Sequence, residues 1–294
     1  MPDEKQIQWF PGHMAKTRRL IKESLPDVDV VLELVDARIP YSSKNPEIQK
    51  LVGAKPLITI LNKAGLASPD ITAAWRAWYR AKGNACVALD CLTGEGVADL
   101  KNTVRDVLSE KIARYEAKGM EGRRLRAMIV GIPNVGKSSL INRLAGGKHA
   151  KVENRPGVTL TKQWVSTGIG LSLLDMPGVL WPKFDEKRVG ENLAVTGAIR
   201  DQILDVEEIS MILALRLREI APALFYDRYR LTSEECDSLD GYDLVECVGR
   251  KRGFLISGGQ VNFRRTAEML LEEFRSGKIG RISLEAPDRR DPHA

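Results

Sequence analysis

A glycine-rich stretch near the middle of the chain has the sequence Gly131-Ile132-Pro133-Asn134-Val135-Gly136-Lys137-Ser138. It fits the pattern G-x-x-x-x-G-K-[ST] of a phosphate-binding loop. An apolar run, Ala127-Met128-Ile129-Val130, precedes it, and a helical pattern over residues 139–144 follows it. The motif requires both flanks, and a chance glycine-rich turn would not have them. The chain is therefore expected to bind a nucleoside triphosphate between a strand and a helix.

The residues of this loop are expected to have separate tasks. Lys137 places a positive charge on the β and γ phosphates, so we count it as catalytic as well as nucleotide-binding. The hydroxyl of Ser138 is a candidate Mg²⁺ ligand, and the start of the following helix adds its dipole. Further nucleotide contacts are expected from Asn134, Val135, Gly136 and Ser139.

Two segments downstream fit the switch regions of such a site. The apolar run at 171–174 ends in Asp175, and Met176-Pro177-Gly178 follows. An acid at this strand end holds Mg²⁺, and the Gly178 N–H can sense a γ-phosphate. Between the loop and this strand lies Arg155-Pro156-Gly157-Val158-Thr159. Pro-Gly alone marks any turn, but in this position Thr159 becomes a candidate catalytic, nucleotide-binding and Mg²⁺-binding residue.

The candidate base-recognition segments lie upstream of the phosphate loop. GTPases recognise guanine with an N-K-x-D segment after a strand, and here Asn62-Lys63-Ala64-Gly65 follows the apolar run at 56–61. A second segment, Asp90-Cys91-Leu92-Thr93-Gly94, follows another strand-like run. We expect the base to be contacted by Asn62, Lys63, Cys91 and Leu92. The motif order is thus circularly permuted, and a permuted chain can rebuild the same site in space.

One position departs from the guanine-recognition pattern. Gly65 stands where the pattern has an aspartate, whose carboxylate accepts two hydrogen bonds from guanine. Losing such a bond relaxes discrimination between bases. We therefore expect GTP to be preferred over ATP by less than in relatives that keep the aspartate, and Gly65→Asp to sharpen that preference.

The apolar runs predict the fold. Near-continuous apolar runs at 28–35, 56–61, 85–89, 127–130 and 171–174 alternate with helical patterns, including 71–82 and 97–118. This alternation predicts an α/β fold, with a mostly parallel sheet covered by helices on both faces. Beyond Pro182 strand signals fade, and 206–220 and 261–274 have helical periodicity. We expect a circularly permuted GTPase domain at 1–189, followed by a small all-helical domain at 190–294.

Charge and composition restrict the partners. Residues 1–189 carry 30 Lys and Arg against 20 Asp and Glu, whereas residues 190–294 carry 15 against 19. This asymmetry fits either a polyanionic partner or a solvated basic surface. The four cysteines form no C-x-x-C pair, which argues against a zinc site and a disulfide framework. No apolar run approaches the roughly 18 residues of a membrane span. We expect a soluble, cytoplasmic monomer.

Taken together, these motifs resemble the circularly permuted ribosome-biogenesis GTPase A family (RbgA/YlqF type) over nearly the whole chain. The resemblance includes Trp9-Phe10-Pro11-Gly12-His13-Met14, Asp36-Ala37-Arg38-Ile39-Pro40, Gly249-Arg250-Lys251-Arg252-Gly253 and the stretch 274–281. It implies binding of GTP and GDP, with GTP hydrolysis coupled to late assembly of the large (50S) ribosomal subunit. It also implies contacts of both domains with the ribosomal RNA of a subunit precursor.

The resemblance also suggests roles for two further residues. Val179 stands where many GTPases have a glutamine that orients the attacking water. His13 is the family-suggested catalytic substitute, and its alternative role is structural or RNA-contacting. Asn134 is similar to the residue of potassium-stimulated members, so it is a candidate K⁺ ligand, and its alternative role is to shape the loop.

Two other function classes remain open from the residues. Gly65 leaves room for a P-loop NTPase of relaxed base specificity, with a metabolic role or a role on non-ribosomal RNA. No second catalytic constellation supports a metabolic enzyme. A nucleotide-independent RNA-binding module with a degenerate site is the other class, and Lys137, Ser138, Thr159 and Asp175 argue against it.

Overall fold

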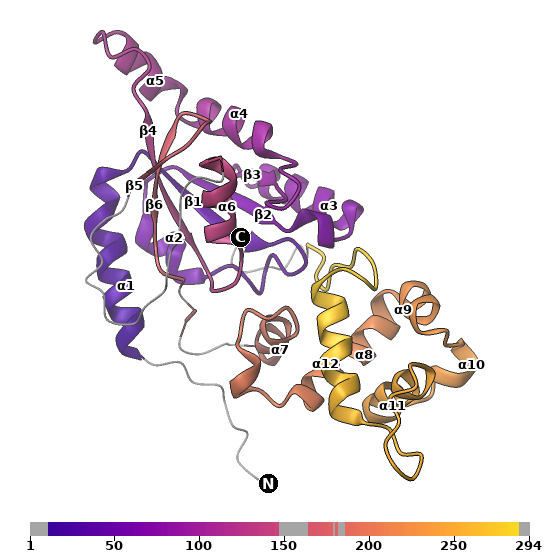
Figure 1. The fold of residues 1–294 in the computed structure, drawn as a ribbon. Helices are drawn as coiled ribbons and strands as arrows, with labels where there is room; N and C mark the ends of the chain where they lie inside the picture. The colour runs from indigo at the N-terminus through magenta and orange to yellow at the C-terminus, as the bar shows by residue number, and fades with distance from the viewer. Residues whose placement is uncertain (1–10, 147–163, 179, 182–185, 288–294) are drawn as a thin grey trace.

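The computed structural model describes residues 11–146, 164–178, 180–181 and 186–287. These residues form an α/β domain and a group of helices that lies beside it, with α7 between the two in the chain (Figure 1). The predicted fold class is confirmed.

The α/β domain is built on a mixed sheet with strand order β3-β2-β1-β4-β6-β5. All neighbours pair in parallel except β5, which is antiparallel to β6 at the edge. The central strand β1 is buried along its whole length, which explains why its sequence is apolar except for Glu33 and the terminal Asp36. The strands are β1 (Val30–Asp36), β2 (Leu57–Asn62), β3 (Ala85–Ala88), β4 (Leu125–Gly131), β5 (Trp164–Ser166) and β6 (Leu171–Asp175).

Helices cover both faces of the sheet. Side chains alternate along a strand, so Val31 and Val35 of β1 face one set of helices and Val30, Leu32 and Leu34 face the other. The first set is α1 (Pro11–Ser24), α2 (Pro46–Val52) and α3 (Pro69–Ala81). The second set is α4 (Val97–Val107), α5 (Ser109–Glu116) and α6 (Lys137–Leu144).

The prediction of one continuous helix over 97–118 is wrong, because this stretch forms two helices. Helix α4 ends at Val107, and α5 begins at Ser109, with Leu108 between them. Leu108 is buried in the apolar core, 3% exposed. Helical periodicity alone did not reveal the break at this residue.

The C-terminal part of the chain is helical, as predicted. The last long helix begins after Asn262, whose side chain accepts a hydrogen bond from the N–H of Arg265 at 3.1 Å. Its apolar face, Ala267, Leu270, Leu271 and Phe274, is buried. The helices are α7 (Lys187–Val195), α8 (Val206–Ile220), α9 (Pro222–Tyr229), α10 (Ser233–Cys236), α11 (Gly241–Lys251) and α12 (Phe263–Arg275), and 3₁₀ turns lie at Leu25–Asp27, Ala64–Leu66 and Asp201–Ile203.

The chain after α12 returns to the α/β domain. The N–H of Ile282 donates to Leu66 O at 3.0 Å, and the N–H of Leu284 donates to Arg38 O at 2.8 Å. The apolar core is also continuous between the two parts through Leu193 and Val195 of α7. The helices are therefore bound to the α/β domain at both ends of their sequence.

One buried carboxyl on β1 makes stability depend on pH. Glu33 is 1% exposed, and its Oε2 has no hydrogen-bond partner among the described residues. Burial raises the pKa of Glu33 to about 7, an effect that the charge of Lys44 partly offsets. In the unfolded chain a glutamate titrates near about 4.3. Between these values the unfolded chain releases a proton that the folded chain keeps, so stability falls as pH rises.

We predict that Glu33→Gln reduces this loss. Between pH 5 and pH 8 the unfolding free energy should fall by about 1–3 kcal/mol less in the variant than in the parent, because the amide cannot ionise. Urea denaturation at both pH values measures the difference. The exposed Glu110 provides the matched control, Glu110→Gln. An equal loss in Glu33→Gln and the parent would contradict the assignment.

Candidate functional site

The phosphate loop joins β4 to α6 at the carboxyl edge of the sheet. Its two pattern glycines have positive φ angles, 152° at Gly131 and 102° at Gly136. An added Cβ at Gly131 would lie 2.6 Å from Leu34 O, and one at Gly136 would lie 2.3 Å from Asn62 Nδ2. Both positions therefore require glycine for conformation and for space. The contact at Gly136 already shows that the upstream base segment lies against this loop.

Lys137 begins α6 and turns its ammonium group into the loop. Its Nζ donates to Gly131 O at 3.1 Å and to Ile132 O at 2.9 Å. Burial lowers the pKa of Lys137 to about 8, although Asp175 acts in the opposite direction. The ammonium thus remains largely charged at pH 7, where a phosphate can replace the two carbonyl partners. Ser138 and Ser139 are exposed at the N-terminus of the same helix.

Asp175 lies at the end of β6, close enough to Lys137 for each to shift the pKa of the other. Burial raises the pKa of Asp175, and the Lys137 charge opposes this. Its Oδ1 is buried and has no hydrogen-bond partner among the described residues. Mg²⁺ prefers oxygen ligands, so a carboxylate oxygen with free acceptor capacity at the phosphate loop fits the Mg²⁺ role. Thr159, the other predicted ligand of the switch loop, lies outside the described residues.

Gly178 lies directly against the phosphate loop. A Cβ added there would lie 2.8 Å from Lys137 Nζ and 2.9 Å from Pro133 N. Real Cβ contacts are not this short, so only glycine allows the segment after β6 to come this close. The position is consistent with the predicted role of the Gly178 N–H near a γ-phosphate. The adjoining Val179 lies outside the described residues.

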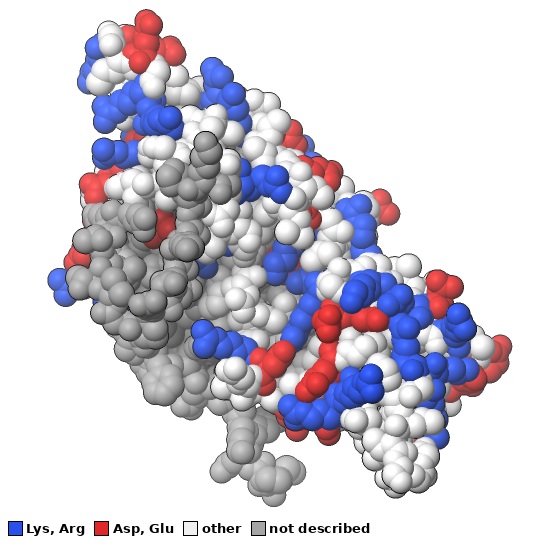
Figure 2. All heavy atoms as spheres, in the orientation of Figure 1, with Lys and Arg blue, Asp and Glu red and all other residues white. Residues whose placement is uncertain are grey.

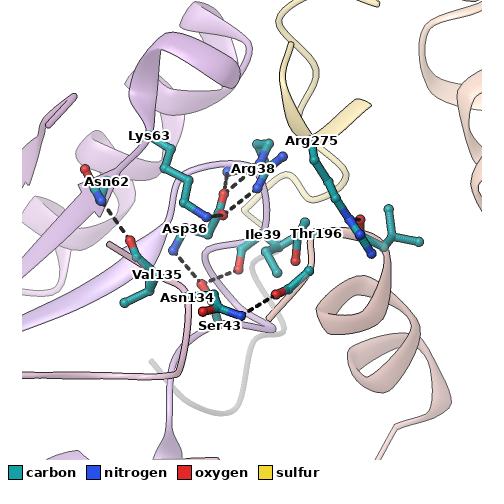
Figure 3. A network of polar contacts seen from close by, with 12 residues as sticks. Asp36, Arg38, Ile39, Ser43, Asn62, Lys63, Asn134, Val135, Thr196 and Arg275 are labelled. Atoms are coloured by element: carbon teal, nitrogen blue, oxygen red, sulfur yellow. Dashed lines mark hydrogen bonds and ion pairs between the residues drawn. The ribbon is translucent and has the colours of Figure 1, made fainter. Parts of the chain in front are cut away.

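The two base segments contact the phosphate loop through Asn62. Its Nδ2 donates to Val135 O at 2.7 Å, as Figure 3 shows, and its Oδ1 accepts from Cys91 Sγ at 3.0 Å. The cysteine thiol thus fixes the amide orientation. Leu92 is 79% exposed, and its N–H donates to Asp90 Oδ1 at 2.8 Å. The predicted base residues therefore lie together, although the Leu92 N–H is already engaged within its own loop.

Lys63 occupies a left-handed conformation with φ of 60°. Its Nζ lies 3.0 Å from Asp36 Oδ2. The same carboxylate accepts from Arg38 Nε at 2.9 Å and from Arg38 Nη2 at 2.7 Å. Burial would raise the pKa of Asp36, but the Arg38 and Lys63 charges outweigh it and hold the pKa well below its usual range. Asp36 therefore stays ionised and connects the base segment to the loop after β1 (Figure 3).

Several residues of this site carry no role that the sequence motifs predict. Asp36 and Arg38 were quoted only as part of the family resemblance and received no role of their own. An acid at the end of a buried strand could have indicated that Asp36 belongs to the site. Arg143 of α6 donates to Cys91 O at 2.7 Å, and nothing in the sequence pattern indicated this contact.

The Nδ2 of Asn134 donates to Gly197 O at 2.9 Å, which connects the phosphate loop to the segment after α7. A small hollow between these elements is lined by Asp36, Lys63, Ile132, Pro133, Asn134, Val135, Thr196 and Ala198.

His13 belongs to the first turn of α1, and its side chain is outside the described part of the structure. Among the described residues, no group of three or more His, Cys, Asp or Glu side chains is arranged to hold a metal. Cys86, Cys91, Cys236 and Cys247 are free thiols. In the described part of the chain, no helix combines the length and apolarity needed to cross a membrane.

The fold and this site define a P-loop GTPase in which base recognition precedes phosphate binding along the chain. Residues 126–224 match the family described as 50S ribosome-binding GTPase. The ribosome biogenesis GTPase A of Bacillus pumilus is 45% identical over 282 residues, which cover 96% of this chain and 99% of that protein. The mouse mitochondrial ribosome-associated GTPase 1 is 34% identical over 95% of this chain and 90% of its own length.

Solved structures agree with this similarity. The crystal structure of GNP-bound YlqF from T. maritima superposes with a TM-score of 0.62 at 27% identity, covering 93% of this chain and 99% of that one. A GDP-bound structure of the same protein gives a TM-score of 0.63. This chain belongs to the ribosome biogenesis GTPase A family and hydrolyses GTP.

We predict that Gly178→Ala lowers GTP turnover at least tenfold and changes GDP affinity less than threefold. The added methyl cannot coexist with Pro133 N at 2.9 Å, so the segment must move away from the position where its N–H can approach a γ-phosphate. Phosphate release and a fluorescent-GDP titration measure the two effects. Gly168→Ala is the control, since its methyl would lie 3.8 Å from the nearest atom. Normal turnover in Gly178→Ala would contradict this role.

Proposed function

We propose that this protein is a GTP-hydrolysing assembly factor that acts in late maturation of the large (50S) ribosomal subunit. In this proposal it binds the ribosomal RNA and ribosomal proteins of a subunit precursor in a nucleotide-dependent way. The supporting observation is that similarity to proteins named ribosome biogenesis GTPase A spans 96% of the chain and therefore includes the helices as well as the GTPase motifs. Residues 1–189 would act as the GTPase domain and 190–294 as the RNA- and ribosome-binding domain of a cytoplasmic monomer.

The surface charge is compatible with an RNA partner. Figure 2 shows Lys and Arg side chains on both parts of the molecule, interspersed with Asp and Glu over the helices. Several basic residues of the C-terminal helices pair with nearby acids, as Arg264 does with Glu268 at 3.0 Å and Lys251 with Glu235 at 3.0 Å. Exposed pairs of this kind contribute only about 0–1 kcal/mol. Their cations are therefore available to phosphates, and such binding should weaken steeply with salt.

Ser138, Thr159 and Asp175 are the proposed Mg²⁺ ligands. When bound with the nucleotide, Mg²⁺ neutralises charge on the β and γ phosphates. The unpartnered, buried Oδ1 of Asp175 supports this assignment. Asn134 is the proposed K⁺ ligand. Its Nδ2 donates to Gly197 O, which leaves the amide oxygen as the atom for a cation.

We predict that K⁺ raises GTP turnover over Na⁺ at matched ionic strength, because a cation beside the phosphates can offset charge that develops during transfer. Asn134→Ala should remove most of the difference between the two salts while still binding GDP. Steady-state phosphate release in each salt measures this. Identical rates in KCl and NaCl for the parent would exclude the potassium proposal.

We also propose that the water-positioning group becomes complete on the ribosomal particle. Val179 has no polar side-chain atom to orient water, so an in-line attack needs another group. His13 is the proposed group, placed at the start of α1 behind a Pro-Gly sequence. Positioning alone can contribute several kcal/mol to a rate, so a partner that fixes His13 could accelerate hydrolysis strongly.

We predict that large-subunit precursors accelerate single-turnover GTP hydrolysis, and that His13→Ala loses most of this acceleration without losing nucleotide affinity. Lys137→Ala, which removes the phosphate-binding cation, is the control that should lose triphosphate binding itself. If precursors stimulate His13→Ala as strongly as the parent, His13 has a docking or structural role. Failure of the particles to bind or stimulate the parent would contradict the proposed ribosomal function.

A further inference from the structure

Gly65 lacks the carboxylate that the guanine-recognition pattern has at this position, but a carboxylate is present beside it. Asp90 is 5% exposed, and its Oδ2 accepts a hydrogen bond from the Gly65 N–H at 3.0 Å. A Cβ added to Gly65 would lie 2.5 Å from the same Oδ2. The Asp90 carboxylate therefore occupies the space where a side chain of residue 65 would begin.

The two segments are fixed side by side, so this proximity is not an accident of one rotamer. Strands β2 and β3 pair in parallel and bring both following loops to one edge of the sheet. The Ala64 N–H donates to Leu89 O at 3.1 Å. Beyond them, Cys91 Sγ donates to Asn62 Oδ1, and Arg143 Nε donates to Cys91 O. Asp90, the first residue of the second base segment, is thus held directly beside the first base segment.

The carboxylate retains capacity for a ligand. An ionised carboxylate has about four acceptor positions on its two oxygens. Its backbone donors are Leu92 and Thr93 on Oδ1, at 2.8 and 3.3 Å, and Gly65 on Oδ2, at 3.0 Å. These bonds hold the carboxylate in place, and Oδ2 can accept a further bond.

We propose that Asp90 is the guanine-specificity residue of this protein and supplies from the second base segment the carboxylate that Gly65 lacks. Its Oδ2 would accept one hydrogen bond from guanine, whose N1–H and 2-amino group are both donors. Residues 65 and 90 form an exchanged pair, because a Cβ at residue 65 would lie 2.5 Å from Asp90 Oδ2 and the two side chains compete for the same space. The proposal rests on the assignment of the base segments made above.

This arrangement corrects an expectation drawn from the sequence. Gly65→Asp alone does not simply restore a missing group, because its Cβ would lie 2.5 Å from Asp90 Oδ2 and two carboxylates would share one site. We expect the single variant to bind GDP more weakly than the parent. The double variant Gly65→Asp/Asp90→Ser has room for the new side chain and should recover the preference for GDP.

The test uses Asp90→Asn, which keeps the side-chain shape. An NH₂ donor at the position of Oδ2 faces the donors of guanine and also loses the hydrogen bond from the Gly65 N–H, a loss that affects every nucleotide alike. Xanthine carries a C2 oxygen in place of the 2-amino group of guanine, so an amide donor suits it. Dissociation constants for GDP, xanthosine diphosphate and ADP are measured with the full chain. The ratio of GDP to xanthosine diphosphate affinity should fall at least tenfold in Asp90→Asn, and it should return in the double variant.

Equal weakening of all three nucleotides in Asp90→Asn, with unchanged ratios, would overturn the inference and leave Asp90 as a residue that shapes its loop. A double variant that binds GDP no better than Gly65→Asp alone would also overturn it. If the parent does not distinguish GDP from ADP, the assignment of the base segments fails, and this inference fails with it. Urea denaturation of each variant checks that affinity losses are not losses of fold.

Discussion

The hydrogen bond from Asn62 Nδ2 to Val135 O, 2.7 Å long, joins the two halves of the nucleotide site. Circular permutation is tolerated because the sheet, not the order of the chain, places the halves. Strand β1 pairs with β2 on one side and β4 on the other, all in parallel, so the loops after β2 and β4 leave from the same edge. Gly136 then allows the approach, since a Cβ there would lie 2.3 Å from Asn62 Nδ2.

The same loops are connected to the helices. Asn134 in the phosphate loop donates to Gly197 O, after α7. From the base segment, Lys63 contacts Asp36, which holds Arg38; the guanidinium of Arg38 lies 5.3 Å from the centre of the Phe274 ring in α12. Both loops of the nucleotide site therefore contact the helical part of the chain directly or through intermediate side chains. Coupling between two sites is reciprocal, so if nucleotide binding changes the affinity of the helices for a partner, that partner changes nucleotide affinity by the same factor.

Much of the fold and part of the site could be predicted from the sequence. The phosphate loop was predictable because its spacing and both flanks agree, and the sheet because buried parallel strands are continuously apolar. Contacts distant in sequence could not be predicted. The interpretation of Gly65 depends on Asp90, which only the pairing of β2 with β3 brings beside it. The break at Leu108 and the short edge strand β5 depend on packing that periodicity does not record. The roles of His13 and Thr159 stay predictions.

Segments in permuted order along the chain form one nucleotide site in this protein. The most direct test of this central claim is the affinity of the Asn62→Ala variant for GDP. The substitution removes the donor to Val135 O and the acceptor for Cys91, and an unpaired buried group costs about 1–3 kcal/mol. Titration calorimetry should show GDP affinity reduced at least tenfold, while the exposed Asn102→Ala binds as the parent does. Near-parental GDP affinity in a folded Asn62→Ala protein would contradict the account, because the base segment would then not support the phosphate loop.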